Sequence, residues 1–425
     1  MDKVNDVVQY ILNMGATVML PIMIFIIALV FRVKVSKALR SALTIGIGMV
    51  GINLVINLLT TNIGPAAQAM VKRFGFHLTV VDVGWPSAAA GAWGQPISSV
   101  LIPILLVTNI VLIMLKVTKT LDIDIWNYWH MVAAGSVAYI VTKSWWFSIL
   151  SAILYMIFCL LIADWTAKDV QEFYGLEGIS FPTGSSDAFG LLGIPISAVV
   201  ARIPGIKNLN ADAETIQKKF GIFGEPMMMG IIIGAVIGIL AGYDVAKVLQ
   251  LGINMGAVMM LMPRMVKLLM EGLMPISESA REVLQKRYGE DREIYLGMDA
   301  ALSTGAPATL ATGLLLVPIT LFIAVILPGN RVLPFGDLAT IPFYVSLIVA
   351  RRKGNIVHSV ITGAIVVAIA LFMATDFTSV HTQMLQGIVK FPAGAAKVSS
   401  LDMGGNFLNW ILLKLGEVVK SIGIV

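Results

Sequence analysis

Polar side chains stand inside some of the most apolar stretches of this chain, and one such group lies at 122–130. This segment reads DIDIWNYWH, so Asn127 and His130 are three residues apart and share one face of a helix. Amide and imidazole groups bind hydroxyls, and aromatic rings cover C–H surfaces, so the pattern favours a carbohydrate-like ligand. The aromatic residues beside them are Trp126, Tyr128 and Trp129. The alternative is an aromatic belt that only anchors a helix at a membrane interface.

Two carboxylates occupy stretches that are rich in Gly, Pro, Ser and Ala. Asp82 lies in 80–94 (VVDVGWPSAAAGAWG), and Asp299 lies in 295–308 (YLGMDAALSTGAPA). Placing a carboxylate at membrane depth costs free energy, so such a residue is a candidate functional group. We favour a ligand-binding role for Asp299, whereas for Asp82 ligand binding and capping of a helix N-terminus both stay open.

A third polar cluster is Thr-Gly-Ser-Ser-Asp at 183–187. It predicts a turn into a helix, whose first N–H groups could bind a polyol or a phosphate. Simple capping of that helix is the alternative.

The sequence contains none of the usual signatures of an enzyme or a metalloprotein. The four histidines show no ligand spacing, and there is no GxxxxGK[ST] loop for a nucleotide. A single cysteine, Cys159, excludes an intramolecular disulfide and a multi-cysteine metal site. We therefore predict no catalytic residue, no metal and no cofactor in this chain.

Composition indicates that these polar groups are embedded in a membrane protein. Hydrophobic residues make up 57% of the 425 residues and charged residues 13%, and the mean hydropathy is +0.87. A soluble protein of this length could not bury so much apolar surface, so lipid is the predicted solvent. The net charge of +5 comes mainly from short loops between apolar runs, which indicates membrane topology rather than nucleic-acid binding.

The chain also reads as two related copies, offset by about 210 residues. Lys37, Gly46 and Pro65 recur as Lys247, Gly256 and Pro275. Such a duplication in an apolar chain is typical of a transporter whose solute site lies between two halves.

About eleven apolar stretches are predicted to cross the bilayer. They lie near 9–31, 41–60, 97–115, 127–142, 146–163, 225–241, 246–262, 309–327, 338–350, 356–374 and 405–425. The broken stretches 80–94 and 295–308 occupy matching positions in the two copies and are predicted to be re-entrant hairpins. Tight helix packing through small residues is the alternative.

The distribution of basic residues predicts that the two copies have opposite orientations. The loop at 32–40 holds four basic residues, whereas its counterpart at 241–247 holds one. The next pair of loops has the opposite bias, with two basic residues at 61–82 and six at 264–292. The stretch 264–292 is predicted to be a cytoplasmic loop. Because basic loops stay in the cytoplasm, the repeats are inverted, with the N-terminus outside and the C-terminus inside.

The predicted fold is therefore an all-α polytopic membrane protein with four regions along the chain. The first repeat, 1–164, has five helices and a hairpin, and 165–224 is a cytoplasmic linker with an amphipathic or re-entrant segment. The second repeat, 225–376, has the other hairpin, and 377–425 forms a tail and a last helix.

Seven longer phrases carry a resemblance to a known family. They are VVDVGWP (80–86), DIWNYWHM (124–131), LEGISFPTGSS (176–186), KKFGIFGEP (218–226), ILAGYDVAKVLQL (239–251), LMPRMVK (261–267) and PGNRVLPFGDLATI (328–341). Together they resemble the ascorbate and galactitol group of IIC permeases, which belong to phosphoenolpyruvate-dependent sugar phosphotransferase systems.

The resemblance implies a homodimer in a bacterial inner membrane. Each protomer would have a V-motif scaffold (9–31, 41–60, 225–241 and 246–262) and a mobile core that carries both hairpins. A phosphocysteine on a separate IIB protein, charged by IIA, would phosphorylate the sugar.

Carried over by position, the family's substrate-binding motifs fall on four parts of this sequence. The implied residues are Asp82, Trp85, Pro86, Ser87, His130, Thr183, Gly184, Ser185, Ser186 and Asp299, and the residue pattern at 122–130 adds Asn127. Family members often have a histidine where Thr183 stands, and another where Ala306 stands. The predicted substrate is therefore galactitol or a related polyol or pentitol.

The sequence thus predicts a sugar-alcohol permease of a phosphotransferase system that binds its substrate near the membrane midplane. The alternative from a different class is an autonomous secondary transporter that couples polyol uptake to protons or sodium through Asp82 or Asp299.

Overall fold

The computed structural model describes residues 16–75, 78–209, 211–212, 215, 218, 221–288, 293–389, 391, 395 and 397–423. The first part of the chain forms α2 (Ala16–Val30), α3 (Val35–Phe74), β1 (Val80–Asp82), α4 (Gly84–Trp93), α5 (Ser98–Met114), β2 (Thr120–Asp122), η1 (Ile125–Asn127), α6 (Tyr128–Thr142), α7 (Trp145–Tyr174), β3 (Ile179–Ser180) and α8 (Gly184–Val200).

The second part of the chain has nearly the same order of elements. After the short 3-10 helix η2 (Gly221–Gly224) come α10 (Pro226–Leu240), α11 (Val245–Tyr288), β4 (Tyr295–Gly297), η3 (Ala300–Gly305), α12 (Pro307–Ile326), β5 (Val332–Leu333), η4 (Leu338–Thr340), α13 (Ile341–Arg351), α14 (Ile356–Leu385), β6 (Lys397–Ser399), α15 (Leu401–Gly404) and α16 (Phe407–Ser421).

Five of the described helices are long and apolar enough to cross a membrane. They are 35–74, 145–174, 245–269, 307–326 and 356–385. Each overlaps a stretch that the sequence predicted to span, and several shorter apolar helices accompany them. The chain is therefore a polytopic membrane protein, as its composition predicted.

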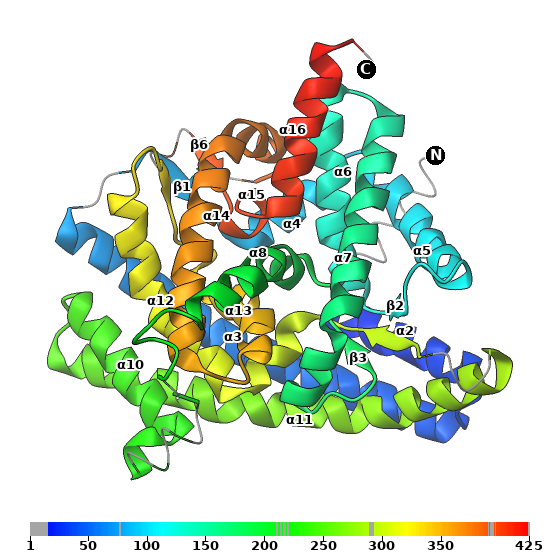
Figure 1. The fold of residues 1–425 in the computed structure, drawn as a ribbon, viewed down its shortest axis with the longest axis horizontal. Coiled ribbons are helices and arrows are strands. Elements are labelled where there is room, and N and C mark those ends of the chain that lie inside the picture. Colours follow the sequence, from blue (N-terminus) through cyan, green and yellow to red (C-terminus); the bar gives the residue numbers. More distant parts are fainter. Residues whose placement is uncertain are drawn as a thin grey trace.

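The two longest helices, α3 and α11, run side by side along one edge of the molecule, with most other helices to one side of them (Figure 1). Gly48 and Gly272 permit this close packing. A Cβ on Gly48 would lie 2.8 Å from the Cα of Leu269, and one on Gly272 would lie 2.8 Å from the carbonyl oxygen of Ser41. Small residues at such positions let helix backbones approach each other in membranes.

The prediction of a cytoplasmic loop at 264–292 is wrong for most of that stretch, because α11 continues to Tyr288. Its many charged residues suggested a loop, but Leu269 and Ile276 are buried. Contact with α3 therefore stabilises a helix in a segment whose composition alone indicated a solvated connection.

The fold also contains two small parallel sheets, which the all-α prediction lacked. In one sheet β1 lies between β5 and β6, and in the other β4 lies between β2 and β3. Each central strand therefore comes from one half of the chain, and both of its neighbours come from the other half. Strands of two or three residues are too short to show the alternation that reveals a strand in a sequence.

The two sheets hold the broken stretches that the sequence predicted to be hairpins. At 80–94, β1 leads directly into the ten-residue helix α4. At 295–308, β4 leads into the six-residue 3-10 helix η3, and α12 follows. Both stretches thus enter the interior as a strand followed by a short helix, and they bring Trp85 and Asp299 to one cavity.

Candidate functional site

A cavity of about 410 Å³ lies between α3 and the elements that carry the predicted site residues. This central cavity is within the size range of small-molecule sites, about 300–1,000 Å³. It is lined by Met49, Ile52, Asn53, Ile56, Thr60, Trp85, Trp126, Asn127, Trp129, His130, Thr183, Ser185, Asp299, Ala301, Ala339, Thr340, Phe343 and Asp402. Six of the eleven residues predicted from the sequence are therefore brought together here.

Three tryptophans form an aromatic wall of the central cavity. Trp85 of α4 meets Trp126 edge to face, with ring centroids 5.8 Å apart, and its ring lies 6.5 Å from that of Trp129. Trp129 also covers the imidazole of His130, at a centroid distance of 3.7 Å. Such rings offer flat apolar faces to the C–H groups of a ligand, while hydroxyls can point elsewhere.

A chain of hydrogen bonds fixes the polar groups on the η1 side of the cavity. The side-chain amide of Asn127 donates to Asp122 Oδ1 at 2.9 Å. The hydroxyl of Thr183 donates to Asn127 Oδ1 at 2.9 Å and accepts from the backbone N–H of Ala300 at 2.9 Å. Thr183 therefore ties the 183–187 motif to the segment that carries Asp299, and these positions are held before any ligand arrives.

A second network joins His130, Ser185 and Asp402. The Ser185 hydroxyl donates to Asp402 Oδ2 at 2.8 Å and lies 3.1 Å from His130 Nε2. Since its single proton is used on Asp402, the serine oxygen accepts a hydrogen bond from Nε2–H. A neutral imidazole with its proton on Nε2 leaves Nδ1 as an acceptor.

Two atoms in this second network have no hydrogen-bond partner among the described residues. They are His130 Nδ1 and Asp402 Oδ1, and both side chains are 1% exposed. Unpaired buried polar atoms are rare because leaving them unpaired costs free energy. Because both residues line the central cavity, they are candidate ligand-binding residues.

Asp299 supplies the second carboxylate of the central cavity. It precedes η3 and caps it, because Oδ1 accepts from the backbone N–H of Ala301 at 2.8 Å. The capping bond holds the carboxylate while part of the side chain remains accessible. The Asp299 side chain could therefore cap η3 with one oxygen and bind a ligand with the other.

The other predicted residues, Asp82, Pro86, Ser87, Gly184 and Ser186, do not line this cavity. Pro86 is exposed, and Ser87 and Ser186 donate to nearby backbone carbonyls. Gly184 lies against Tyr155 and His130, where a Cβ would collide with both side chains. These residues shape the surroundings of the site without facing its interior.

Asp82 is a backbone acceptor in the described structure. It is 1% exposed, and its oxygens accept N–H bonds from Gly84 at 3.0 Å, Phe335 at 3.1 Å and Asp337 at 2.9 Å. Asp337 in turn accepts from the backbone N–H of Trp85. The two carboxylates thus join the strand that ends at Asp82 to the loop after β5, and they hold Trp85 in position.

Several cavity residues were missed by the sequence reasoning, and Asp402 is the most important of them. It lies in SSLDMGG, a stretch that was predicted to be a tail before the last helix. Asn53 and Thr60, both of α3, also line the cavity and were not among the predicted site residues. The one signal that could have pointed to the region of Asp402 was the duplication of the sequence. In the two equivalent sheets, β6 lies beside β1 in the same way that β3 lies beside β4.

Comparisons with known proteins identify the family of this chain. A family model described as the sugar-specific permease component of the PTS system matches residues 10–394. The galactitol-specific EIIC component of the PTS system of Escherichia coli K12 is 42% identical over 411 residues, which cover 97% of this chain and 91% of that protein. A putative permease IIC component of the same organism is 40% identical over 423 residues, covering 98% and 96%. The chain therefore belongs to the family of sugar-specific permease components of the PTS system.

Proposed function

We propose that this chain is the IIC permease of a galactitol phosphotransferase system, or of a system for a closely related polyol. The observation that supports this best is the central cavity, which an aromatic wall and the polar residues His130, Asp299 and Asp402 line together. A neutral polyhydroxylated chain matches this set of groups. The name of the E. coli relative, which is galactitol-specific, gives the same substrate.

In the proposed complex, substrate hydroxyls donate to Asp402 Oδ1, to the free oxygen of Asp299 and to His130 Nδ1. Hydrogen bonds to charged acceptors are stronger than those between neutral groups, so the carboxylates provide most of the polar contribution. The tryptophans cover the carbon chain. Binding of this kind needs no net charge on the ligand, in agreement with the prediction of a sugar alcohol.

The proposed transport movement is a displacement of a core domain against a scaffold. The scaffold comprises α2, α3, α10 and α11, which pack on one another, and the remaining elements form the core. The central cavity has α3 on one side and core elements on the others, so such a displacement would carry the bound substrate past α3. The repeated order of elements supports two structural repeats. Their inverted orientation, about eleven spans and a homodimer built on the scaffold are further parts of the proposal.

We place the protein in a bacterial inner membrane, with the N-terminus outside and the C-terminus in the cytoplasm. Arg351 is the last residue of α13, Arg352 and Lys353 follow it, and more basic residues lie in the second half of α11. These clusters support a cytoplasmic position for that end of the molecule.

As a permease component, the chain is the translocation subunit and is not itself the phosphoryl donor. In the proposed reaction, a substrate hydroxyl oxygen attacks the phosphorus of a phosphocysteine on the IIB protein. The P–O bond forms, the P–S bond breaks, the cysteine leaves as a thiolate and the hydroxyl proton passes to solvent. IIA then recharges IIB.

Uptake into membrane vesicles tests this function. With phosphoenolpyruvate and the IIA and IIB proteins inside, radiolabelled galactitol is expected to accumulate as its phosphate. Without phosphoenolpyruvate, accumulation is expected to stop. Concentrative uptake of unmodified galactitol in the absence of those proteins would contradict the proposal and would indicate a secondary transporter.

Asp299→Asn is expected to weaken galactitol binding roughly tenfold, because a charged acceptor is lost. The asparagine oxygen can still accept from Ala301, so the melting temperature is expected to change little. Isothermal titration of the purified protein measures the affinity. An unchanged affinity would remove Asp299 from the binding site.

A further inference from the structure

The helix α3 forms one wall of the central cavity, although it belongs to the proposed scaffold and not to the core. The residues of α3 that line the cavity recur at helical spacing, so they share one face of the helix. They are Met49, Ile52, Asn53, Ile56 and Thr60. A ligand in the cavity therefore meets a mostly apolar strip of the scaffold in which two polar side chains are set.

The two polar side chains of this strip differ in how their hydrogen bonds are used. The hydroxyl of Thr60 donates to a carbonyl oxygen of its own helix, that of Ile56, at 3.1 Å. The side chain of Asn53 is exposed, and no hydrogen bond joins it to another described residue. Its amide therefore has both N–H groups and its oxygen free for a ligand.

Asn62 shows how an asparagine of α3 contributes to helix packing. Its amide donates to the carbonyl oxygen of Leu58 at 2.7 Å, and its side-chain oxygen accepts from Asn254 of α11 at 2.7 Å. Interhelical bonds of this kind are a common role of asparagine in membrane helices. Asn53 makes no such bond within the described part of the chain, so it is a candidate functional residue of the same helix.

The core side of the central cavity carries two carboxylates, Asp299 and Asp402. An ionised carboxylate only accepts hydrogen bonds, whereas a hydroxyl of a polyol can donate one and accept others. A hydroxyl that donates to a charged acceptor also becomes a better acceptor itself. The amide of Asn53 lines the same cavity and offers donors from the α3 wall. The two walls are therefore chemically complementary around a hydroxyl.

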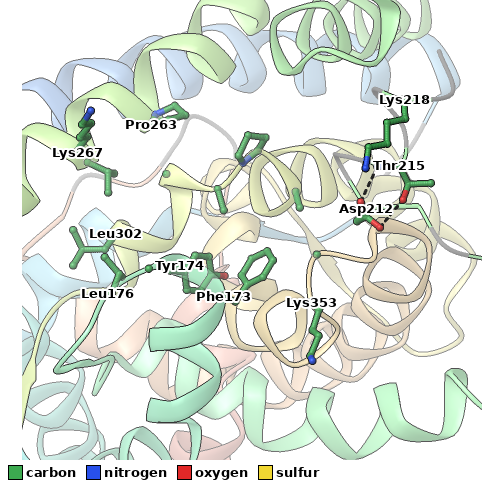
Figure 2. Close-up of a pocket in the computed structure, with 17 residues that line it drawn as sticks. Phe173, Tyr174, Leu176, Asp212, Thr215, Lys218, Pro263, Lys267, Leu302 and Lys353 are labelled. Atoms are coloured by element: carbon green, nitrogen blue, oxygen red, sulfur yellow. Dashed lines mark hydrogen bonds between the residues drawn. The ribbon is translucent and has the colours of Figure 1, made fainter. Parts of the chain in front are cut away.

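The other large cavity, of about 780 Å³, lacks such an arrangement among its described lining residues. Figure 2 shows the side chains of Lys267 and Lys353 far apart and pointing away from each other. Polar groups that diverge in this way do not hold one small ligand. The pairing of donors with acceptors around a single space is therefore found in the central cavity.

We propose that Asn53 is a substrate-contacting residue of the scaffold, whose side-chain N–H donates to a hydroxyl of the polyol that the core carboxylates hold. This inference rests on the proposed function, because it requires a polyhydroxylated substrate in the central cavity. The bound substrate then bridges scaffold and core, so it stabilises the arrangement of the two that the structure shows. When the core moves past α3, the bond to Asn53 breaks while the core carboxylates keep the substrate.

Paired substitutions on α3 test this contact by isothermal titration of the full-length protein in lipid nanodiscs. Asn53→Ala is expected to weaken galactitol binding roughly fivefold, because one hydrogen bond between neutral groups is lost. Asn53→Asp is expected to weaken it further, because a carboxylate cannot donate and is repelled by the two on the core side. Asn57→Ala is the matched control, since Asn57 is exposed one turn further along α3 and does not line the cavity. It is expected to leave the affinity unchanged.

Cysteine labelling gives a second readout that reports proximity of the ligand. Cys159 is the single cysteine of the chain and is buried, so the background reaction is low. Saturating galactitol is expected to slow the reaction of the Asn53→Cys variant with a small water-soluble thiol reagent. The reaction of Asn57→Cys is expected to keep its rate.

Two results would overturn the inference and leave the proposed function intact. In the first, Asn53→Ala binds galactitol as tightly as the unchanged protein. In the second, Asn53→Ala lowers the affinity together with the melting temperature of the ligand-free protein, and galactitol does not protect Asn53→Cys, which would assign Asn53 to packing. If the unchanged protein does not bind galactitol at all, the proposed function fails and this inference fails with it.

Discussion

Asp402→Asn is expected to weaken galactitol binding by roughly a hundredfold, a larger loss of affinity than that expected for Asp299→Asn. The carboxylate is 1% exposed, and Oδ1 has no partner among the described residues. A hydrogen bond to a charged group contributes about 1.5–3 kcal/mol, and each 1.4 kcal/mol corresponds to a factor of about ten in affinity. The substitution removes that charge and also weakens the acceptor that holds Ser185 and His130.

Isothermal titration against galactitol measures this effect, and circular dichroism checks that the helical content is unchanged. Asp376→Asn is the matched control, because Asp376 is a half-exposed residue of α14 that pairs with Lys414. It is expected to bind galactitol normally. Equal affinities of the two variants would show that Asp402 has only a structural role.

Asp82→Ala is expected to lower stability strongly, by about 3 kcal/mol or more, because it removes the acceptor of several buried backbone N–H groups. The bonds from Gly84, Phe335 and Asp337 are all lost together. Each unsatisfied buried donor costs about 1–3 kcal/mol. The expected result is a large drop in the melting temperature of the protein in detergent.

The surface variant Asp376→Ala provides the comparison for stability, since an exposed ion pair contributes about 1 kcal/mol or less. The fraction of Asp82→Ala that remains folded is expected to bind galactitol with an affinity reduced at most severalfold. A variant of normal stability that had lost binding would instead assign Asp82 to the ligand.

The membrane-spanning architecture could be predicted because the length of each apolar stretch can be read directly from the sequence. Stretches such as 146–163 and 356–374 fall within α7 and α14. The grouping of Asn127, His130, Thr183 and Asp299 followed from polar residues that stand out at membrane depth, together with the family resemblance. All four line the central cavity.

The remaining features depend on contacts between residues that are far apart in the chain. Ser185 and Asp402 are separated by 217 positions, and nothing local to SSLDMGG reveals their hydrogen bond. The same holds for Asp82, whose partners lie near 335. The extension of α11 beyond the predicted span at 246–262 was missed for a related reason. Its stability comes from packing against α3, whereas its own sequence pattern is ambiguous.

The interleaved sheets have a consequence for how the polypeptide matures during synthesis. β1 is made early, but its two neighbours are residues 332–333 and 397–399. The nascent chain must therefore hold β1 without both of its neighbours until translation has nearly finished. A ribosome that stops after residue 396 would release a product with most of its hydrophobic helices but without β6 and Asp402, and membrane quality-control proteases would be expected to remove it.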